Sequence, residues 1–230
     1  MLTEVVILCG GKGTRLRSVV KDVPKPMAPV AGRPFLEIIL SQFRNSGISR
    51  VVLSTGFMAS IISNHFGDRF QGMEIDYNEE LEPLGTGGAA RASAQVCQGD
   101  NIMVCNGDTF IEFDFAAAKM ICETKSAPVA ITLKAPDTER YGRIEVDEAA
   151  IAQFRGRGVV GPGSISGGVY LLPRALLLDD PRPAPFSMED FIFDAGRPGC
   201  VYALGAHGRF IDIGIPSDYE IAQSMIGARI

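Results

Sequence analysis

The chain has 230 residues and a formal net charge of −5 at pH 7, and this acidic balance argues against a nucleic-acid-binding surface. Hydrophobic residues make up 46% of the sequence and charged residues 21%, as in an ordinary single-domain globular protein. No apolar run approaches the roughly 20 residues that a membrane-spanning helix needs, and no basic segment precedes an apolar leader, so we expect no membrane contact.

The cysteines of the chain are widely scattered, and most have apolar neighbours. An odd number without regular spacing matches neither a disulfide framework nor a zinc site. We therefore expect reduced, packed thiols and a cytoplasmic location. The five residues are Cys9, Cys97, Cys105, Cys122 and Cys200.

Close to the N-terminus, an apolar run at residues 5–8 predicts a buried strand that leads directly into a glycine-rich loop. Glycines allow the backbone to approach a polyphosphate closely, and the hydroxyl and guanidinium after them add hydrogen-bond donors. The loop therefore predicts a phosphate cradle; the alternative is a strand connection that only needs positive φ angles. Its residues are Gly10, Gly11, Gly13, Thr14 and Arg15.

Lys25 follows in a proline-rich segment, between Pro24 and Pro26. The two prolines restrict the backbone around it to an extended form, which directs the ammonium group one way. We expect a second phosphate contact here, and the alternative is a solvated lysine in a stiff loop.

Hydrophobic periodicity then predicts alternating helices and strands. Helices are expected at residues 35–46 and 58–66, and strands at residues 51–53 and 73–77. With the first strand, this β-α-β-α-β order predicts a parallel sheet covered by helices on both faces. Right-handed crossovers place the carboxyl ends of such strands on one edge, where ligands bind.

A second glycine-rich loop, residues 80–89, follows the third strand and leads into a helix of small residues that ends near residue 96. Glycines at the start of a helix expose free N–H groups and give close access to a flat ring or a ribose. The loop lies on the same predicted edge as the first one, so we expect the two loops to bind one ligand.

The fourth strand, residues 101–105, is followed by Gly107 and Asp108. A carboxylate at the end of a buried strand suits Mg²⁺, which takes one or two protein carboxylates and completes its shell with phosphates and waters. The alternative is a cap for the helix expected at residues 115–124. Because Asp114 can cap that helix, we favour the metal role for Asp108.

Beyond residue 128 the pattern becomes rich in strands. We expect a hairpin of residues 140–146 and 151–155 around residues 147–150, and a short helix at residues 187–193 that Ser187 and Asp190 cap. The remaining expectations are strands at residues 129–133, 169–172, 201–204 and 210–214, a glycine-rich loop at residues 156–168, and a last helix from residue 215.

Asp212 lies inside the apolar strand at residues 210–214, where an unpartnered carboxylate is costly. One explanation is a cation shared with Asp108. The other, equally compatible with the position, is a structural aspartate that accepts backbone hydrogen bonds.

These motifs together resemble those of the sugar-1-phosphate nucleotidylyltransferases, nearly from end to end. The resemblance rests on residues 8–16, 24–27, 82–88, 106–108, 140–142, 166–170 and 212–216. Residues 7–11, 25–29 and 186–191 most resemble D-glycero-α-D-manno-heptose 1-phosphate guanylyltransferases.

The family resemblance implies a three-layer, Rossmann-like α/β fold, with a mostly parallel sheet, helices on both faces and a small β-rich sugar-binding part. It implies a single domain over residues 1–230, with a nucleotide-binding half at about 1–127 and a sugar-phosphate-binding half at about 128–230.

The resemblance also implies a reaction: a sugar 1-phosphate attacks the α-phosphorus of a nucleoside triphosphate, an NDP-sugar forms and pyrophosphate leaves. The phosphate nucleophile has its second pKa near ~6, so no general base is required. The implied catalytic residues are Arg15, Lys25, Asp108 and Asp212, and the two aspartates would hold Mg²⁺. The implied nucleotide contacts are Leu8, Gly10, Gly11, Gly13, Thr14, Glu80, Gly85, Thr86 and Gly88, and the sugar-phosphate contacts are Tyr141, Gly142, Arg157, Ser166 and Gly167.

Two positions bear on the substrates. Glu80 stands where relatives that use thymidine or uridine nucleotides often have glutamine, and a carboxylate suits the adjacent N1–H and N2–H₂ donors of guanine, which favours GTP. Relatives commonly carry a Glu-Lys pair after the hairpin, but residues 154–157 here read Phe-Arg-Gly-Arg. The acid is missing and Arg157 takes the place of the lysine, while Ser166 stands where many relatives have asparagine.

Alternative functions remain open at this point. One is a uridylyltransferase acting on N-acetylmuramate or hexose 1-phosphate, and another is a non-catalytic regulatory protein that binds nucleotide sugars. The regulatory interpretation is disfavoured because Arg15, Lys25 and both aspartates are present. A dinucleotide-binding oxidoreductase is disfavoured because the first loop lacks the third glycine of that fingerprint. The sequence leaves homo-oligomer formation open.

Overall fold

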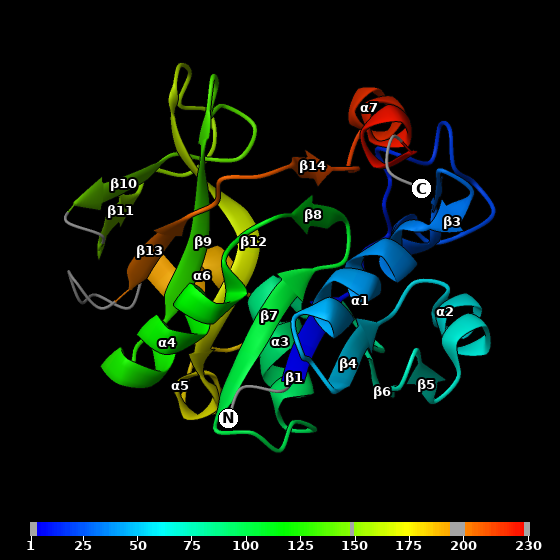
Figure 1. The fold of residues 1–230 in the computed structure, drawn as a ribbon, viewed down its shortest axis with the longest axis horizontal. Helices are drawn as coiled ribbons and strands as arrows, with labels where there is room; N and C mark the ends of the chain where they lie inside the picture. Colours follow the sequence, from blue (N-terminus) through cyan, green and yellow to red (C-terminus); the bar gives the residue numbers. More distant parts are fainter. Residues whose placement is uncertain (1–3, 148–149, 194–200, 228–230) are drawn as a thin grey trace.

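The protein folds into three layers, with one large sheet between two layers of helices (Figure 1). The structure, a computed structural model, describes residues 4–147, 150–193 and 201–227. Its main sheet has ten strands in the order β10-β11-β13-β9-β12-β7-β1-β4-β6-β5. The expected three-layer α/β fold is confirmed, and one continuous sheet runs through both halves proposed from the sequence.

Four neighbouring parallel strands form the part of the sheet that the N-terminal half builds. In spatial order they are β7 (Asn101–Asn106), β1 (Glu4–Leu8), β4 (Arg50–Thr55) and β6 (Met73–Glu79), with β5 (Arg69–Phe70) antiparallel at the edge. Leu8 is level with Ser54 on one side and Asn106 on the other. The segments that follow these strands therefore leave the sheet at one edge, as the sequence predicted.

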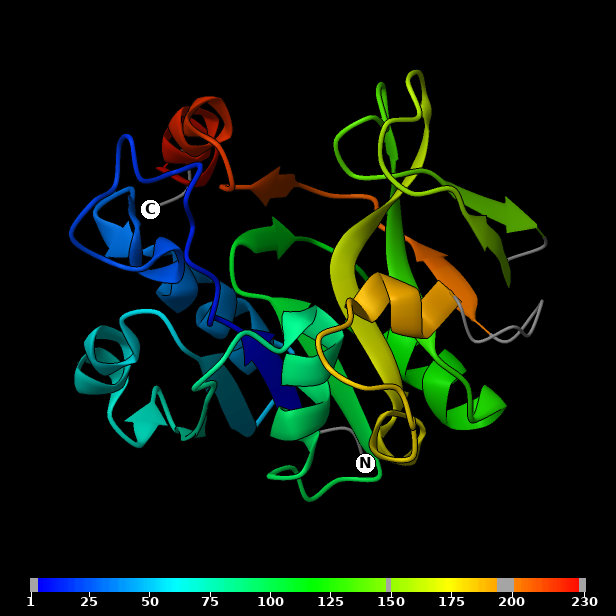
Figure 2. The ribbon, with the colours of Figure 1, turned by 180° about the vertical axis from the view of Figure 1, so that it is seen from behind.

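Helices cover both faces of the sheet because the side chains on both faces of its central strands are apolar. Val5 and Ile7 point into one core, whereas Val6 points into the other. The first face carries α1 (Phe35–Asn45), α2 (Ala59–Phe66) and α4 (Phe115–Lys125). The second face, seen in front in Figure 2, carries α3 (Gly85–Ala94), α5 (Arg174–Leu178) and α6 (Met188–Phe193).

The C-terminal half adds mostly antiparallel strands and one further helix. They are β9 (Val129–Ala135), β10 (Ile144–Asp147), β11 (Ala150–Phe154), β12 (Gly163–Pro173), β13 (Tyr202–Gly205) and α7 (Pro216–Gly227). Two small sheets complete the fold: β2 (Pro29–Val30) with β3 (Arg33–Pro34), and β8 (Thr109–Ile111) with β14 (Phe210–Asp212).

Several expectations for this half were wrong in extent, among them the strand expected at residues 210–214, which ends at Asp212. The first hairpin strand begins at Ile144, because residues 139–141 form a turn in which the Gly142 N–H donates to the Thr138 carbonyl at 2.8 Å. The strand expected at residues 169–172 begins already at Gly163 and pairs with β9 through an irregularity between Ser166 and Tyr170. The glycines within residues 156–168 predicted a loop, but the last part of this segment belongs to a strand with a bulge.

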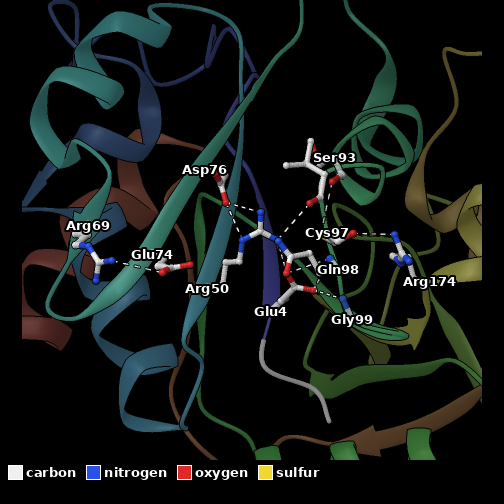
Figure 3. Close-up of polar contacts among 11 residues, drawn as sticks. Glu4, Arg50, Arg69, Glu74, Asp76, Ser93, Cys97, Gln98, Gly99 and Arg174 are labelled. Atoms are coloured by element: carbon white, nitrogen blue, oxygen red, sulfur yellow. Dashed lines mark hydrogen bonds and ion pairs between the residues drawn. The ribbon is translucent and has the colours of Figure 1, made fainter.

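At the amino ends of the parallel strands, a charged network ties neighbouring elements together (Figure 3). The Glu4 carboxylate accepts hydrogen bonds from the backbone N–H groups of Gln98 and Gly99, and it pairs with Arg50. Arg50 also pairs with Asp76 on β6, at 2.6 Å. This network lies at the end of β1 opposite to the glycine-rich loops, so it stabilises the sheet rather than the ligand edge.

The expected state of the cysteines is confirmed for the described residues. Cys9, Cys97, Cys105 and Cys122 are buried free thiols, and burial raises the pKa of the Cys97 thiol to about 12. Cys200 lies outside the described residues. Among the described helices, none has the length and apolar character needed to cross a bilayer.

Candidate active site

A cavity of about 870 Å³ opens at the carboxyl edge of the parallel strands. Both glycine-rich loops, the end of β7, the bulged part of β12 and the start of α6 line it. The expectation that the two loops share one ligand site therefore agrees with the cavity, which is continuous from one loop to the other.

The first loop leaves β1 in a conformation fixed by its neighbours. Cys9 donates its N–H to the Ser54 carbonyl at 2.7 Å, and Gly107 donates to the Leu8 carbonyl at 3.0 Å. A side chain at Gly10 would place its Cβ 2.3 Å from Oε1 of Glu80, so any other residue here would require the Glu80 carboxylate to move. The backbone of this loop thus passes directly against the second loop.

The second loop is held against the segment before α6. Gly85 has a φ angle of +72°, and a Cβ on it would lie 2.4 Å from the Phe186 carbonyl oxygen. The Gly87 N–H bonds to that same oxygen at 2.9 Å, and the Thr86 hydroxyl accepts the N–H of Met188 at 2.9 Å. The start of α3 and the start of α6 are therefore one rigid unit beside the cavity.

Lys25 reaches the cavity from a one-turn 3-10 helix (Lys25–Met27), whereas the sequence predicted an extended backbone at this residue. The turn forms because the Met27 N–H bonds to the Pro24 carbonyl at 2.8 Å and the side chain of Met27 is buried. The Lys25 ammonium forms an ion pair with Asp108, which comes from the end of β7. Arg15 lines the same cavity and is exposed.

Asp212 lies beside Asp108 because β14 pairs with β8. Asp212 is level with Thr109 in that ladder, and the Ile213 N–H bonds to the Asp108 carbonyl at 3.0 Å. The Asp212 carboxylate accepts a hydrogen bond from Arg140 at 2.8 Å and from the Gly214 N–H at 2.6 Å. Its protein partners are thus a guanidinium and a backbone N–H, of which the structural explanation of this residue anticipated only the backbone hydrogen bond.

The two carboxylates nevertheless retain the character of a cation site. Burial and the charge of Asp108 raise the pKa of Asp212, although Arg140 and Lys25 act in the opposite direction. A divalent cation between the carboxylates would relieve that repulsion. Among the described residues no cluster of three or more His, Cys, Asp or Glu side chains could hold a metal, so an ion at this point would have two protein carboxylates, Asp108 and Asp212, as ligands. That number fits Mg²⁺, which completes its shell with phosphates and water.

The opposite part of the cavity is built by the C-terminal half. Of the residues expected to bind the sugar phosphate, Tyr141, Arg157, Ser166 and Gly167 line it. The Tyr141 ring packs edge-on against Phe210, with 5.8 Å between ring centroids.

Not every residue expected at the site lies on the cavity wall. Thr14 is exposed beyond the cradle, and Gly13 turns the chain at a φ angle of +59° beside Lys25. Gly88 faces Leu84 and Ala184, and Gly142 packs against the hairpin. These four are absent from the lining, which contains all the other residues that the sequence indicated: Leu8, Gly10, Gly11, Arg15, Lys25, Glu80, Gly85, Thr86, Asp108, Tyr141, Arg157, Ser166, Gly167 and Asp212.

The sequence missed two side chains that matter to this cavity. Arg140, which pairs with both Asp212 and Asp218, was part of a recognised motif but had no assigned role. Glu189 lines the cavity from α6. In the sequence, Glu189 is recognisable only as an acidic residue in a short helix, after a serine that caps the helix. Only the tertiary fold shows that it lies at the cavity.

The fold and the cavity define the class of protein as a nucleotide-binding α/β transferase. Glycine-rich loops and cations lie at one edge of the sheet, and two carboxylates lie between the two halves of the chain. The sequence model of the family described as nucleotidyl transferase matches residues 4–222. The chain belongs to that family, so the assignment made from its motifs is confirmed.

Among the curated relatives, the chain is 38% identical over 218 residues to D-glycero-alpha-D-manno-heptose 1-phosphate guanylyltransferase of Campylobacter jejuni, covering 94% of this chain and 96% of the relative. It is 38% identical over 222 residues to the enzyme of the same name from Aneurinibacillus thermoaerophilus, covering 96% of each. The crystal structure of HddC from Yersinia pseudotuberculosis complexed with GMP-PN superposes with a TM-score of 0.82 at 34% identity, covering 97% of this chain and 99% of that one. The resemblance to the heptose guanylyltransferases is thereby confirmed.

Proposed function

We propose that this protein transfers a guanylyl group from GTP to D-glycero-α-D-manno-heptose 1-phosphate, giving a GDP-sugar and pyrophosphate. The observation that carries the proposal is the single cavity in which the glycine cradle, Lys25 and the two aspartates lie together with Arg157. Relatives that align over nearly the whole chain bear the name of this activity. Such an enzyme works on small substrates, and we place it in the cytoplasm.

The chain's own residues account for binding and orientation of the nucleotide. In our proposal Arg15 braces the β- and γ-phosphates, which leave as pyrophosphate, and Lys25 neutralises the α-phosphate or the incoming phosphate. The backbone of Gly10 and Gly11 passes close to the phosphates, since no side chain is in the way. Glu80, fixed beside Gly10, accepts hydrogen bonds from the N1–H and N2–H₂ groups of guanine.

The sugar phosphate approaches from the C-terminal half, where Arg157 clamps its phosphate and Tyr141 borders its path. The phosphate is largely dianionic at neutral pH, so the residues need not remove a proton from it. Catalysis then consists of holding two anions in line and compensating their charge.

Members of this family generally use a divalent metal ion. We propose Mg²⁺ as that ion, held by Asp108 and Asp212. When bound, it would act as a Lewis acid and template at the α-phosphate. Lys25 pairs with Asp108 and Arg140 pairs with Asp212, and these ion pairs hold the two carboxylates in place.

The test is a pyrophosphate-release screen of the four common NTPs against a panel of sugar 1-phosphates, in the presence of Mg²⁺. We expect the fastest release with GTP and the heptose 1-phosphate. Release that is fastest with UTP and N-acetylmuramate or a hexose 1-phosphate would replace the proposed substrates, and no release with any pair would overturn the enzyme assignment.

A further inference from the structure

Glu189 places a carboxylate in the sugar-side part of the cavity, and none of the proposed roles uses it. It is half-buried in the first turn of α6 and shares the cavity wall with Ser166 and Arg157. Among the described residues it forms no ion pair, unlike Asp108 and Asp212, each of which faces a cation. A half-buried carboxylate without a cation requires hydrogen-bond donors instead.

One donor is supplied by the protein. The Tyr170 hydroxyl donates to Oε1 of Glu189 at 2.9 Å and lies 2.7 Å from the Ser166 hydroxyl. Tyr170 is 1% exposed, so this hydroxyl is fixed in the core of the sheet. The second carboxylate oxygen has no hydrogen-bond partner within the described part of the chain, and Glu189 itself lines the cavity.

The position of the carboxylate is set by the rigid unit at the start of α6. Thr86 accepts the N–H of Met188, and Ser187 and Asp190 exchange reciprocal hydrogen bonds at 2.9 and 3.2 Å that cap the helix. Glu189 is therefore held at a fixed distance from the nucleotide loop before any ligand binds.

We propose that Glu189, oriented by Tyr170, is the acid that selects the sugar, by accepting hydrogen bonds from ring hydroxyls of the sugar 1-phosphate. Ser166 would supply the neighbouring contact. This inference rests on the proposed function. It also explains how the chain can lack the acidic residue that relatives carry beside Arg157: a carboxylate arrives from a different element, α6, on the same wall of the cavity.

The charge distribution assigns this carboxylate to hydroxyls and not to phosphate. A phosphate dianion beside Glu189 would be repelled, whereas Arg157 and Lys25 offer cations elsewhere on the wall. A sugar hydroxyl is a neutral donor, and a carboxylate is its strongest common acceptor in proteins. The sugar 1-phosphate is thereby oriented with its phosphate toward the cations and its hydroxyls toward α6.

The test compares wild type with Glu189→Gln and Tyr170→Phe, using the best sugar 1-phosphate from the substrate screen and its monodeoxy analogues. We expect Glu189→Gln to lower kcat/KM for the full sugar by about 10- to 100-fold, mainly through KM. The analogue that lacks the contacted hydroxyl should be used equally well by wild type and variant. Tyr170→Phe, which only releases the carboxylate from one donor, should raise KM for the sugar less, and GTP affinity measured by calorimetry should stay unchanged in both.

Asp190→Asn is the control, because it removes the charge of the exposed carboxylate on the next residue while the asparagine oxygen can still accept the Ser187 N–H and keep the helix cap. If Glu189→Gln loses the same factor with every deoxy analogue, or loses GTP affinity equally, the residue is structural and the inference is wrong. Unchanged sugar kinetics would overturn it as well. A wild-type enzyme inactive with every sugar 1-phosphate would instead refute the proposed function, so the two failures are distinguishable.

Discussion

Replacing Glu80 by glutamine tests the base specificity that the cavity is proposed to impose. The carboxylate is held by two contacts, from the Ser54 hydroxyl to Oε1 at 3.2 Å and from the Leu84 N–H to Oε2 at 3.3 Å. A glutamine can keep both, because its oxygen can accept from Leu84 and its amide nitrogen can donate to the Ser54 hydroxyl. The substitution therefore changes recognition without removing the local support.

The magnitude follows from the hydrogen bonds that guanine would lose. Two donors of guanine face two carboxylate oxygens in wild type, but one oxygen and one NH₂ group in the variant. Loss of a hydrogen bond to a charged acceptor costs about 1.5–3 kcal/mol, which is about 10- to 100-fold in kcat/KM for GTP. Uracil has a single N3–H that the remaining amide oxygen can accept, so turnover with UTP should stay within about threefold.

The assay is pyrophosphate release with GTP and UTP at fixed sugar 1-phosphate, with Glu123→Gln on the outer side of α4 as a control of equal charge. We expect the GTP-to-UTP ratio of kcat/KM to fall by about 10- to 100-fold in Glu80→Gln and to stay constant in the control. An unchanged ratio would refute the assignment of Glu80 to the base.

Three further outcomes follow from the structure. Asp108→Asn and Asp212→Asn should each lower kcat by at least about 100-fold and weaken Mg²⁺ binding by the GTP complex in calorimetry; near-native values in both would refute the metal assignment. Burial alone would raise the pKa of Glu4, but hydrogen bonds from Gly99, Arg50 and Gln98 outweigh it and lower that pKa. The ionised Glu4 carboxylate therefore stabilises the fold above pH 4.5, and this stabilisation is lost as pH falls through the depressed pKa. Glu4→Gln should thus reduce the free energy of urea unfolding by about 1–3 kcal/mol at pH 7 and by less at pH 3, and an equal loss at both would contradict this. Gly85→Ala should destabilise the fold by at least about 1 kcal/mol in thermal unfolding, because of its φ of +72° and its contact with Phe186, and a neutral effect would show that the loop relaxes freely.

The sequence was sufficient for the parallel strands and main helices of the N-terminal half because local patterns there coincide with tertiary structure. The apolar run that forms β1 is buried on both faces, as expected for a central parallel strand. Helix α1 ends at Asn45, just before Gly47, which takes a φ angle of +84°. Asp114 caps α4 through the Ala117 N–H at 2.9 Å, which leaves Asp108 for the cavity as anticipated.

The sequence was insufficient where glycine serves packing and where partners are distant. In β12, a Cβ at Gly167 would lie 2.4 Å from Cδ1 of Ile111 and 3.2 Å from the Ile131 carbonyl oxygen, so this glycine marks a close approach within a strand and not a loop. Arg140 and Asp212 are 72 residues apart, and no periodicity links them. Residues of this kind meet only through long-range strand pairing, which local patterns do not encode.

The proposed roles divide the charged side chains of the cavity into carboxylates that accept from neutral groups and cations that hold phosphates. Glu80 lies at the end proposed for the base and Glu189 at the end proposed for the sugar ring, with Arg15, Lys25 and Arg157 among the other lining residues. A nucleotide bound in reverse would bring its phosphates against Glu80, and a reversed sugar phosphate would meet Glu189, so both wrong orientations carry an electrostatic penalty. Because the phosphates of both substrates are drawn to the same cations, the two anions are expected to meet beside Asp108 and Asp212. In this proposal the acidic residues orient the two substrates, and the cations hold their phosphates together.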